Sequence, residues 1–361
     1  MSTPSMSRGG AAPVRALTRI ARVATAVGLL AFVLGIALGR ADVVFAALAA
    51  NWLFFAGLAA GSVAVAAAIR IAQGGWAAPV LPIADASTGF FVPALCVLAV
   101  LVAGARTFLP WLRHAGGARH ATLALLLLVV TAILFALGRR LVSSARRGDE
   151  QGRVRARAVV YVLAFAVVLS VWTFQLVLSI WEGPPPTVLP PYYFLGAFVS
   201  GVAWVGLVAA VSGMSGPDLR HDIGKLLFAF IVVWSYLLWA LFLPTWYGNI
   251  PEETAALLAR WRGRWTPLTA AVLIAVFAWP FWLLFTERLK RRRATLAAGA
   301  AAVLLGLLGE CFLLVVPSLH LSGGTGPLLL GAGVTVGMAG LFLLSVGQRV
   351  VAAARAPSAA C

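Results

Sequence analysis

The chain has 361 residues, of which 62% are hydrophobic and 11% are charged, with a mean hydropathy of +0.98 and a formal net charge of +17. A water-soluble globular domain does not need this much apolar surface, so the composition excludes soluble enzymes and soluble binding modules. It predicts a polytopic membrane protein.

Ten continuous apolar runs are each long enough to cross a bilayer core of about 30 Å at 1.5 Å per residue. Continuous rather than alternating apolarity favours helices over barrel strands. The runs cover residues 23–39, 43–69, 89–109, 121–142, 158–181, 191–213, 225–246, 267–286, 294–316 and 326–348. The sequence predicts an all-α polytopic membrane protein of about ten transmembrane helices. Its membrane domain is 23–350, between a basic N-terminus (1–22) and a tail (351–361).

The basic residues follow the expected topology. Of the 28 Lys and Arg residues, 21 lie in the N-terminus, the even-numbered loops and the C-terminus, and 7 lie in the odd-numbered loops. This bias predicts a multi-pass protein with both termini in the cytoplasm. The positive net charge therefore reflects membrane topology and does not indicate nucleic-acid binding. The largest cluster, seven arginines within residues 139–157, could bind anionic membrane lipids.

The first apolar run has an alternative interpretation. Arg8, Arg15, Arg19 and Arg22 precede it, and it ends in small residues, as a signal peptide would. Removing it would leave nine spans and disturb the charge pattern, so we favour a retained first helix.

Small residues predict close helix packing in three runs, namely the second, the sixth and the last. Gly57 and Gly61 are four residues apart in the second run, and Gly333 and Gly337 in the last. The second and sixth runs also share a pattern at an offset of about 140 residues. Its matching positions are Phe54 with Phe194, Ala60 with Ser200, and Gly61 with Gly201. The match suggests a parallel repeat of spans two to five in spans six to nine.

Asp85 stands alone in apolar surroundings near the start of the third run. It is either an acid that faces water at a helix start or a proton-accepting carboxylate at the cytoplasmic side.

The stretch 221–253 concentrates side chains capable of chemistry. His221, Asp222 and Lys225 lie at the foot of the seventh run. Lys225, Tyr236 and Trp246 fall on one helical stripe, together with Trp239.

After this run, Tyr247, Gly248 and Asn249 predict a turn, and Pro251, Glu252 and Glu253 predict the first turn of another helix. The two acids either cap this helix or belong to a site.

Glu310 lies about 9 Å from the outer end of the otherwise apolar ninth run. A carboxylate there is costly unless it is protonated, paired or hydrated, which favours a functional role. In contrast, the three cysteines are far apart and the four histidines lie in loops or at span ends. We therefore expect no metal centre, no haem and no iron–sulfur cluster in this chain.

Residues 224–230 (GKLLFAF), 234–236 (WSY) and 246–254 (WYGNIPEET) resemble the NrfD-like integral membrane subunits of bacterial alternative complex III, and the ActF type more closely. Thinner similarity extends through 76–85, 176–179 with 192–201, and 310–319. The resemblance implies two four-helix bundles, at 43–181 and 190–316, plus two flanking helices, the second at 326–348.

The resemblance also implies a bacterial cytoplasmic (inner) membrane protein in a quinol-oxidising respiratory complex. The implied partners are a sister NrfD-like subunit and peripheral subunits with iron–sulfur clusters and c-type haems. Quinol would be the only cofactor near this chain. We expect no catalytic residue in it.

Quinol oxidation needs an aromatic wall and proton acceptors. The quinone-site candidates lie at the outer end of the stretch: Trp246, Tyr247, Asn249, Glu252 and Glu253. The candidates for a proton path are Asp85, His221, Asp222, Lys225, Tyr236 and Glu310.

Two alternatives stay open. Gln175, Leu241, Pro82 and Cys311 replace polar or charged residues usual in the family. These departures favour a scaffold that docks the other subunits without a quinone site or a complete proton path. A secondary transporter would be expected to show broken helices and a polar midplane site, neither of which is evident.

Overall fold

A computed structural model describes residues 8–113, 116–181, 183–213, 215–321 and 324–355. The chain is 89% helical, and no strand occurs in the described ranges. Ten segments of these ranges are long and apolar enough to cross a membrane. The prediction of an all-α polytopic membrane protein is therefore confirmed.

Five spans form the first half of the chain. They are α1 (Arg8–Ala37), α2 (Ala41–Ile71), α3 (Leu81–Ala86) continued by α4 (Phe91–Ala103), α7 (Gly117–Arg146) and α8 (Gln151–Leu176). A 3₁₀ turn joins α3 to α4. Two single-turn helices follow α4, namely α5 (Ala105–Phe108) and α6 (Pro110–Arg113).

The second half also holds five spans. They are α9 (Leu189–Ser212), α10 (Pro217–Gly248), α12 (Thr266–Leu273) continued by α13 (Trp279–Phe285), α15 (Arg293–Val315) and α16 (Thr325–Arg355). Its flanking helix α16 comes last, whereas the flanking helix α1 of the first half comes first. A π-helical turn joins α12 to α13. The shorter α11 (Pro251–Trp261) and α14 (Glu287–Lys290) lie between spans. Proline in the first turn of α9, α10 and α11 suits their starts, because its missing N–H needs no partner there.

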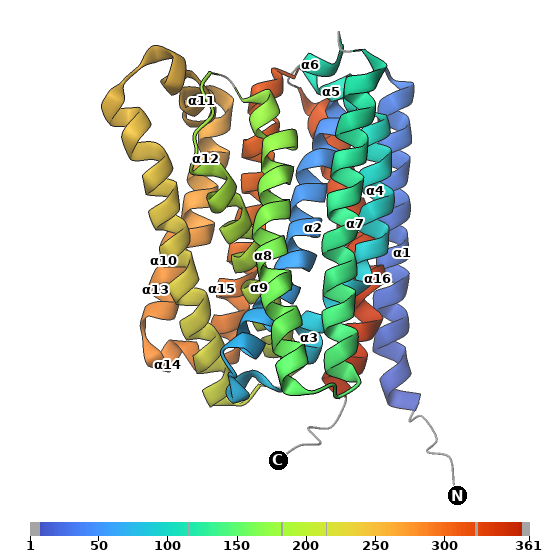
Figure 1. The fold of residues 1–361 in the computed structure, drawn as a ribbon, viewed down its shortest axis with the longest axis vertical. Coiled ribbons are helices and arrows are strands. Elements are labelled where there is room, and N and C mark those ends of the chain that lie inside the picture. Colours follow the sequence, from blue (N-terminus) through green and yellow to red (C-terminus); the bar gives the residue numbers. More distant parts are fainter. Residues whose placement is uncertain (1–7, 114–115, 182, 214, 322–323, 356–361) are drawn as a thin grey trace, which may run out of the picture.

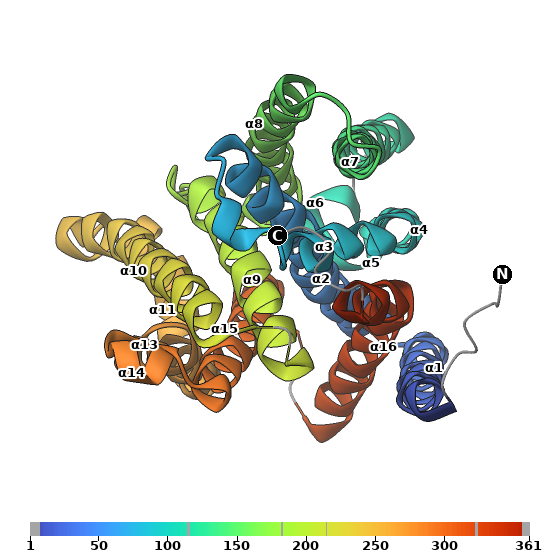
Figure 2. The ribbon, with the colours of Figure 1, turned by 90° about the horizontal axis from the view of Figure 1, so that it is seen from below.

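The helices form two four-helix bundles with equivalent contacts. In the first bundle α2 contacts α4 and α8, and α7 contacts α4 and α8; in the second, α9 contacts α10 and α15, and α13 contacts α10 and α15. Between the bundles α2 contacts α9 and α15, while α9 contacts α2 and α8. Exchanging the halves preserves this pattern, as the parallel repeat predicts. In Figure 2 the two bundles meet at α2 and α9.

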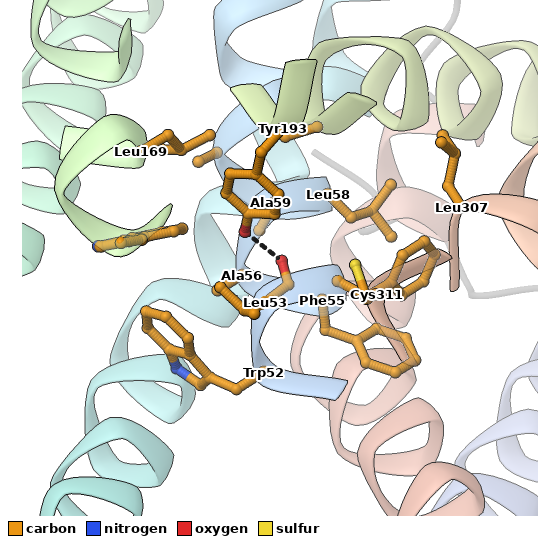
Figure 3. Close-up of a cluster of buried hydrophobic side chains, with 14 of the residues drawn as sticks. Trp52, Leu53, Phe55, Ala56, Leu58, Ala59, Leu169, Tyr193, Leu307 and Cys311 are labelled. Atoms are coloured by element: carbon orange, nitrogen blue, oxygen red, sulfur yellow. Dashed lines mark hydrogen bonds between the residues drawn. The ribbon is translucent and has the colours of Figure 1, made fainter. Parts of the chain in front are cut away.

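Glycines let α2 and α9 approach at their backbones. A Cβ added to Gly201 would lie 2.5 Å from backbone atoms of Gly61 and Ser62, and one added to Gly61 would collide with the Ala197 carbonyl. The Tyr193 hydroxyl donates a hydrogen bond of 2.9 Å to the Leu53 carbonyl at the same contact (Figure 3). The predicted close packing at Gly61 is thus confirmed.

The flanking helices α1 and α16 pack on each other, and α16 also contacts α2 and α3. An added Cβ on Gly337 would meet backbone atoms of Gly28, and one on Gly333 would lie 2.5 Å from the Ala31 Cβ atom. The second predicted small-residue pair therefore faces the first helix of the chain.

Both flanking helices have their chain-terminal ends at one end of the molecule (Figure 1). We call this the basic end, because the arginine-rich connection between α7 and α8 also lies there. The opposite, distal end carries α5, α6 and α11.

Candidate functional site

Glu310 lies inside the second bundle. Its residue is 7% exposed, and Tyr192 and Trp234 line the same small cavity as its carboxyl group. The Tyr192 and Trp234 rings pack at 5.6 Å between centroids. Neither the Glu310 Oε1 atom nor the Trp234 Nε1 atom has a hydrogen-bond partner among the described residues. A buried polar atom without a partner is costly, which marks this position as more than packing.

Two small cavities lie beside this carboxyl group. The larger, of about 70 Å³, is lined by Glu310, Tyr192 and Trp234 together with Arg260 and Leu241. The smaller, of about 20 Å³, is lined by Glu310, Tyr193 and Cys311 among others. A buried water needs about 10–15 Å³ of such volume, so the first cavity has room for several waters and the second for one. The arrangement can therefore hydrate Glu310 from both sides.

Arg260 is the polar residue that faces Glu310 across the larger cavity from α11. It is 6% exposed, and its guanidinium stacks over the Trp181 ring at 4.0 Å. Its Nε atom donates to the Leu313 carbonyl at 2.9 Å, and its second terminal nitrogen donates to the Ser318 hydroxyl at 2.8 Å. The arginine thereby supplies positive charge at the C-terminus of α15, where the helix dipole favours it.

The equivalent position of the first bundle holds no carboxylate. Tyr192 matches Trp52 at the repeat offset, and the Trp52 ring packs on Trp172 at 4.6 Å. Both indoles are satisfied: Trp52 donates to the Ala94 carbonyl at 2.8 Å and Trp172 to the Thr131 hydroxyl at 2.9 Å. Among the described residues, the polar site beside Glu310 therefore has no counterpart at the Trp52–Trp172 position of the first bundle.

The five quinone-site candidates do not line either cavity beside Glu310. Trp246 and Tyr247 are 60% and 84% exposed, and Glu252 lies in the exposed first turn of α11 with Glu253, which is half-buried. Asn249 ends α10 in the left-handed conformation, with its N–H donating to the Thr245 carbonyl at 3.1 Å. The predicted turn over Tyr247, Gly248 and Asn249 is wrong in its first two residues, because α10 continues through Gly248 and the chain turns only at Asn249, at an outer corner of the distal end (Figure 1).

The predicted stripe on α10 does form, but it faces outward. Tyr236 is 66% exposed, and Trp239 and Trp246 are more than half exposed as well. Tyr236 therefore cannot relay protons through the interior of this chain. The spacing of the stripe does not determine how α10 is rotated about its axis. In the structure this rotation turns the stripe away from α9, so the stripe faces lipid or another chain.

Asp85 is neither an acid facing water nor a free carboxylate. It is 4% exposed and forms a bidentate ion pair with Arg70 of α2, at 3.0 and 2.7 Å. The predicted water-facing position is therefore wrong, since the short loop after α2 folds α3 back against that helix. In such a pair two charge-assisted hydrogen bonds join the guanidinium to the carboxylate.

The other basic-end candidates lie together on α10. The Lys225 ammonium is 3.0 Å from the Asp222 carboxylate, and the His221 Nδ1 atom has no hydrogen-bond partner in the described part of the chain. Nearby, Arg291 holds the pKa of Glu287 below its usual range, and the charge of His221 acts in the same direction. This network lies at the opposite end of α10 from the Glu310 cavity.

Across the described ranges, no group of three or more His, Cys, Asp or Glu side chains lies close enough together to hold a metal ion. Cys96 is exposed and Cys311 is buried, both as free thiols, while Cys361 and His114 lie outside the described residues.

No known family model matches the chain, and neither does any curated protein. The resemblance to NrfD-like subunits thus rests on the motifs quoted above and stays a prediction.

Sequence reasoning missed Arg70 and Arg260. Both had been assigned to the topological charge pattern. The available signal for Arg260 was its place in an amphipathic helix between two tryptophan-rich segments, and for Arg70 its place one short loop before a lone acid. Neither signal identifies a partner without the tertiary contacts.

Proposed function

We propose that this chain is a membrane subunit of a quinol-oxidising respiratory complex of the alternative complex III type, and that its chemical contribution is proton transfer at Glu310. The observation that carries the proposal is the buried Glu310 carboxyl group, with one oxygen unpartnered among the described residues and space for water on both sides. A carboxyl group with such neighbours can accept and release a proton.

Volume separates a proton role from a quinone role at this position. Sites for small organic ligands usually have about 300–1,000 Å³, several times the 70 Å³ beside Glu310. The cavity suits water and not a quinone ring. By the positive-inside rule the basic end is cytoplasmic, so Glu310 and Arg260 lie toward the outer side of a bacterial inner membrane.

A quinol that reaches this subunit would have to use another surface. A groove of about 690 Å³ runs between α15 and α16, with Phe312, Leu328 and Gly331 in its walls and Arg264 and Trp265 at the distal end. Its apolar walls suit an isoprenoid chain or an acyl chain. The quinone-binding part of the proposal requires this groove or a surface shared with the sister subunit.

The test begins with purification from the native membrane in mild detergent. Iron–sulfur and c-type haem subunits should co-purify, with quinol-oxidising turnover, and mass spectrometry and absorbance would identify them. If the chain emerges without redox partners, the respiratory proposal is wrong. In the assembled complex, Glu310→Gln should lower turnover about 100-fold or more, the usual contribution of a positioned proton-transfer group. The matched control, Glu150→Gln, changes an exposed acid at the opposite end of the molecule and should leave turnover unchanged.

The second candidate is a structural subunit without its own chemistry. The outward position of Trp246, Tyr247 and Tyr236 favours it, because exposed aromatic side chains can dock a neighbouring subunit. An intact complex in which Glu310→Gln keeps full turnover would establish the scaffold and exclude the proton role.

A further inference from the structure

The basic end carries a groove between α7 and α8 that lies far from Glu310. Its volume is about 540 Å³, and three arginines line it: Arg140 of α7, Arg147 directly after the last residue of α7, and Arg157 of α8. Figure 2 looks at this end and places the α7–α8 connection at the edge of the molecule. We call it the α7–α8 groove, and its volume is in the usual range for a ligand site.

One stripe of α7 forms a wall of this groove. Leu137, Arg140, Ser143 and Arg147 are spaced three, three and four residues apart, so they share a helix face. The stripe extends about 15 Å along the axis, from an apolar residue within the span to a charged residue at its end. From α8, Ala156 and Val160 add apolar surface, and Val160 is 49% exposed. The groove therefore changes from apolar to basic in the direction of the membrane surface.

The charges of the groove are only partly compensated. Asp149 accepts hydrogen bonds from the Ser144 hydroxyl at 2.7 Å and from Arg157 at 2.9 Å, and lies 3.6 Å from Arg147. Within the described ranges no acidic side chain forms an ion pair with Arg140. Three guanidinium groups and one carboxylate leave an excess of two positive charges. Arg140 starts about 10 Å deeper than Arg147, so its side chain must extend toward the surface to place its charge in a polar layer.

We propose that the α7–α8 groove binds an anionic phospholipid, with the phosphodiester headgroup on Arg140, Arg147 and Arg157 and an acyl chain along Leu137 and Val160. Guanidinium groups bind phosphate through paired N–H donors, and an apolar wall next to them favours a lipid over a free ion because it can bury an acyl chain. Basic pockets between transmembrane helices are known to bind such headgroups. This site is independent of the proposed respiratory function.

The experiment titrates the purified full chain in mild detergent with phosphatidylglycerol and with phosphatidylcholine, and counts bound lipid by native mass spectrometry. Phosphatidylglycerol should be retained in preference to phosphatidylcholine. Arg140→Gln should weaken its binding about fivefold, the effect of one arginine near a lipid headgroup. Arg139→Gln is the matched control: it removes the same charge from the adjacent exposed residue, which does not line the groove, and binding should stay within twofold of the parent chain.

Three outcomes would overturn the proposal: equal loss in the two variants, equal retention of the two lipids, or displacement of phosphatidylglycerol by inorganic phosphate at a similar concentration. The last would indicate an ion site. If Arg140→Gln does not fold, Arg147→Gln serves in its place, because the Arg147 side chain is 61% exposed and Asp149 keeps its closer partners Ser144 and Arg157.

Discussion

The Tyr193 hydroxyl donates a hydrogen bond of 2.9 Å to the carbonyl of Leu53, the residue 140 positions earlier. This separation equals the offset of the internal repeat, so the bond joins a residue to its own counterpart in the other bundle. The two bundles therefore meet through two equivalent helices, α2 and α9, which cross at Gly61 and Gly201.

Gly201→Ala should destabilise this crossing. The added Cβ would lie 2.5 Å from the Gly61 carbonyl carbon and from the Ser62 nitrogen, and neither backbone can move without shifting α2. We expect a loss of about 1–3 kcal/mol, typical of overpacking, and a lower melting temperature of the detergent-solubilised chain. Gly331→Ala is the control, since its Cβ would lie an ordinary 3.8 Å from Ala47. Equal melting temperatures in the two variants would contradict the close approach.

Asp85→Asn should be strongly destabilising, because it leaves the guanidinium of Arg70 without its carboxylate at a site where the two side chains are 12% and 6% exposed. Removing one partner of a buried pair costs about 3–5 kcal/mol, whereas replacing both by apolar residues is often neutral. The double variant Arg70→Met with Asp85→Leu should therefore melt close to the parent chain. If that double variant is stable but loses turnover in the complex, Asp85 has a role beyond structure.

Arg260→Gln should release α11 from the end of α15. The change removes hydrogen bonds to the carbonyls of Leu313 and Leu314 and to Ser318, and the contact with Trp181. A loss of about 3 kcal/mol is expected for charged hydrogen bonds of this kind. Hydrogen exchange of α11 should quicken in this variant and not in Arg262→Gln, whose side chain is exposed. Unchanged exchange in both variants would show that Arg260 does not anchor α11.

The stability of the α7–α8 connection should depend on acid pH. The Ser144 hydrogen bond and the pairs with Arg157 and Arg147 hold the pKa of Asp149 below its usual value of about 4. A carboxyl group with a lowered folded-state pKa stabilises the fold above its unfolded-state pKa. This contribution disappears as the pH falls through the lowered value. The melting temperature should therefore fall as the pH is lowered below about 4. This fall should be smaller in the variant Asp149→Asn than in the control Glu150→Gln. The same acid profile in both variants would refute this role.

Composition and the lengths of the apolar runs were sufficient for the fold class and the membrane spans. The seventh run, predicted at 225–246, lies within α10 (Pro217–Gly248), and the second, predicted at 43–69, lies within α2 (Ala41–Ile71). Apolarity detects the membrane core of a helix. The charged turns beyond it, such as the one that holds Asp218, continue the helix in a polar environment that the pattern does not mark.

The site was predictable only in part. A single buried carboxylate in an apolar run identified Glu310, because its cost is visible in the sequence alone. The partners of a side chain depend on how each helix is rotated and on which helix lies opposite. These are tertiary properties, so the sequence did not identify the partners of Arg70 and Arg260. It also placed Tyr236 in a candidate proton path and Trp246 in a candidate quinone site, although their stripe faces outward. A stripe of aromatic residues shows that they share a face but not which way that face points.

The contact of Gly28 with Gly337 joins the first span of the chain to the last. During synthesis α1 leaves the ribosome some three hundred residues before its main neighbour exists, and until α16 follows, this small-residue face of α1 has only lipid to meet. Assembly of the membrane domain can therefore be completed only after α16 has been synthesised and inserted, because α16 brings the glycine surface that α1 requires.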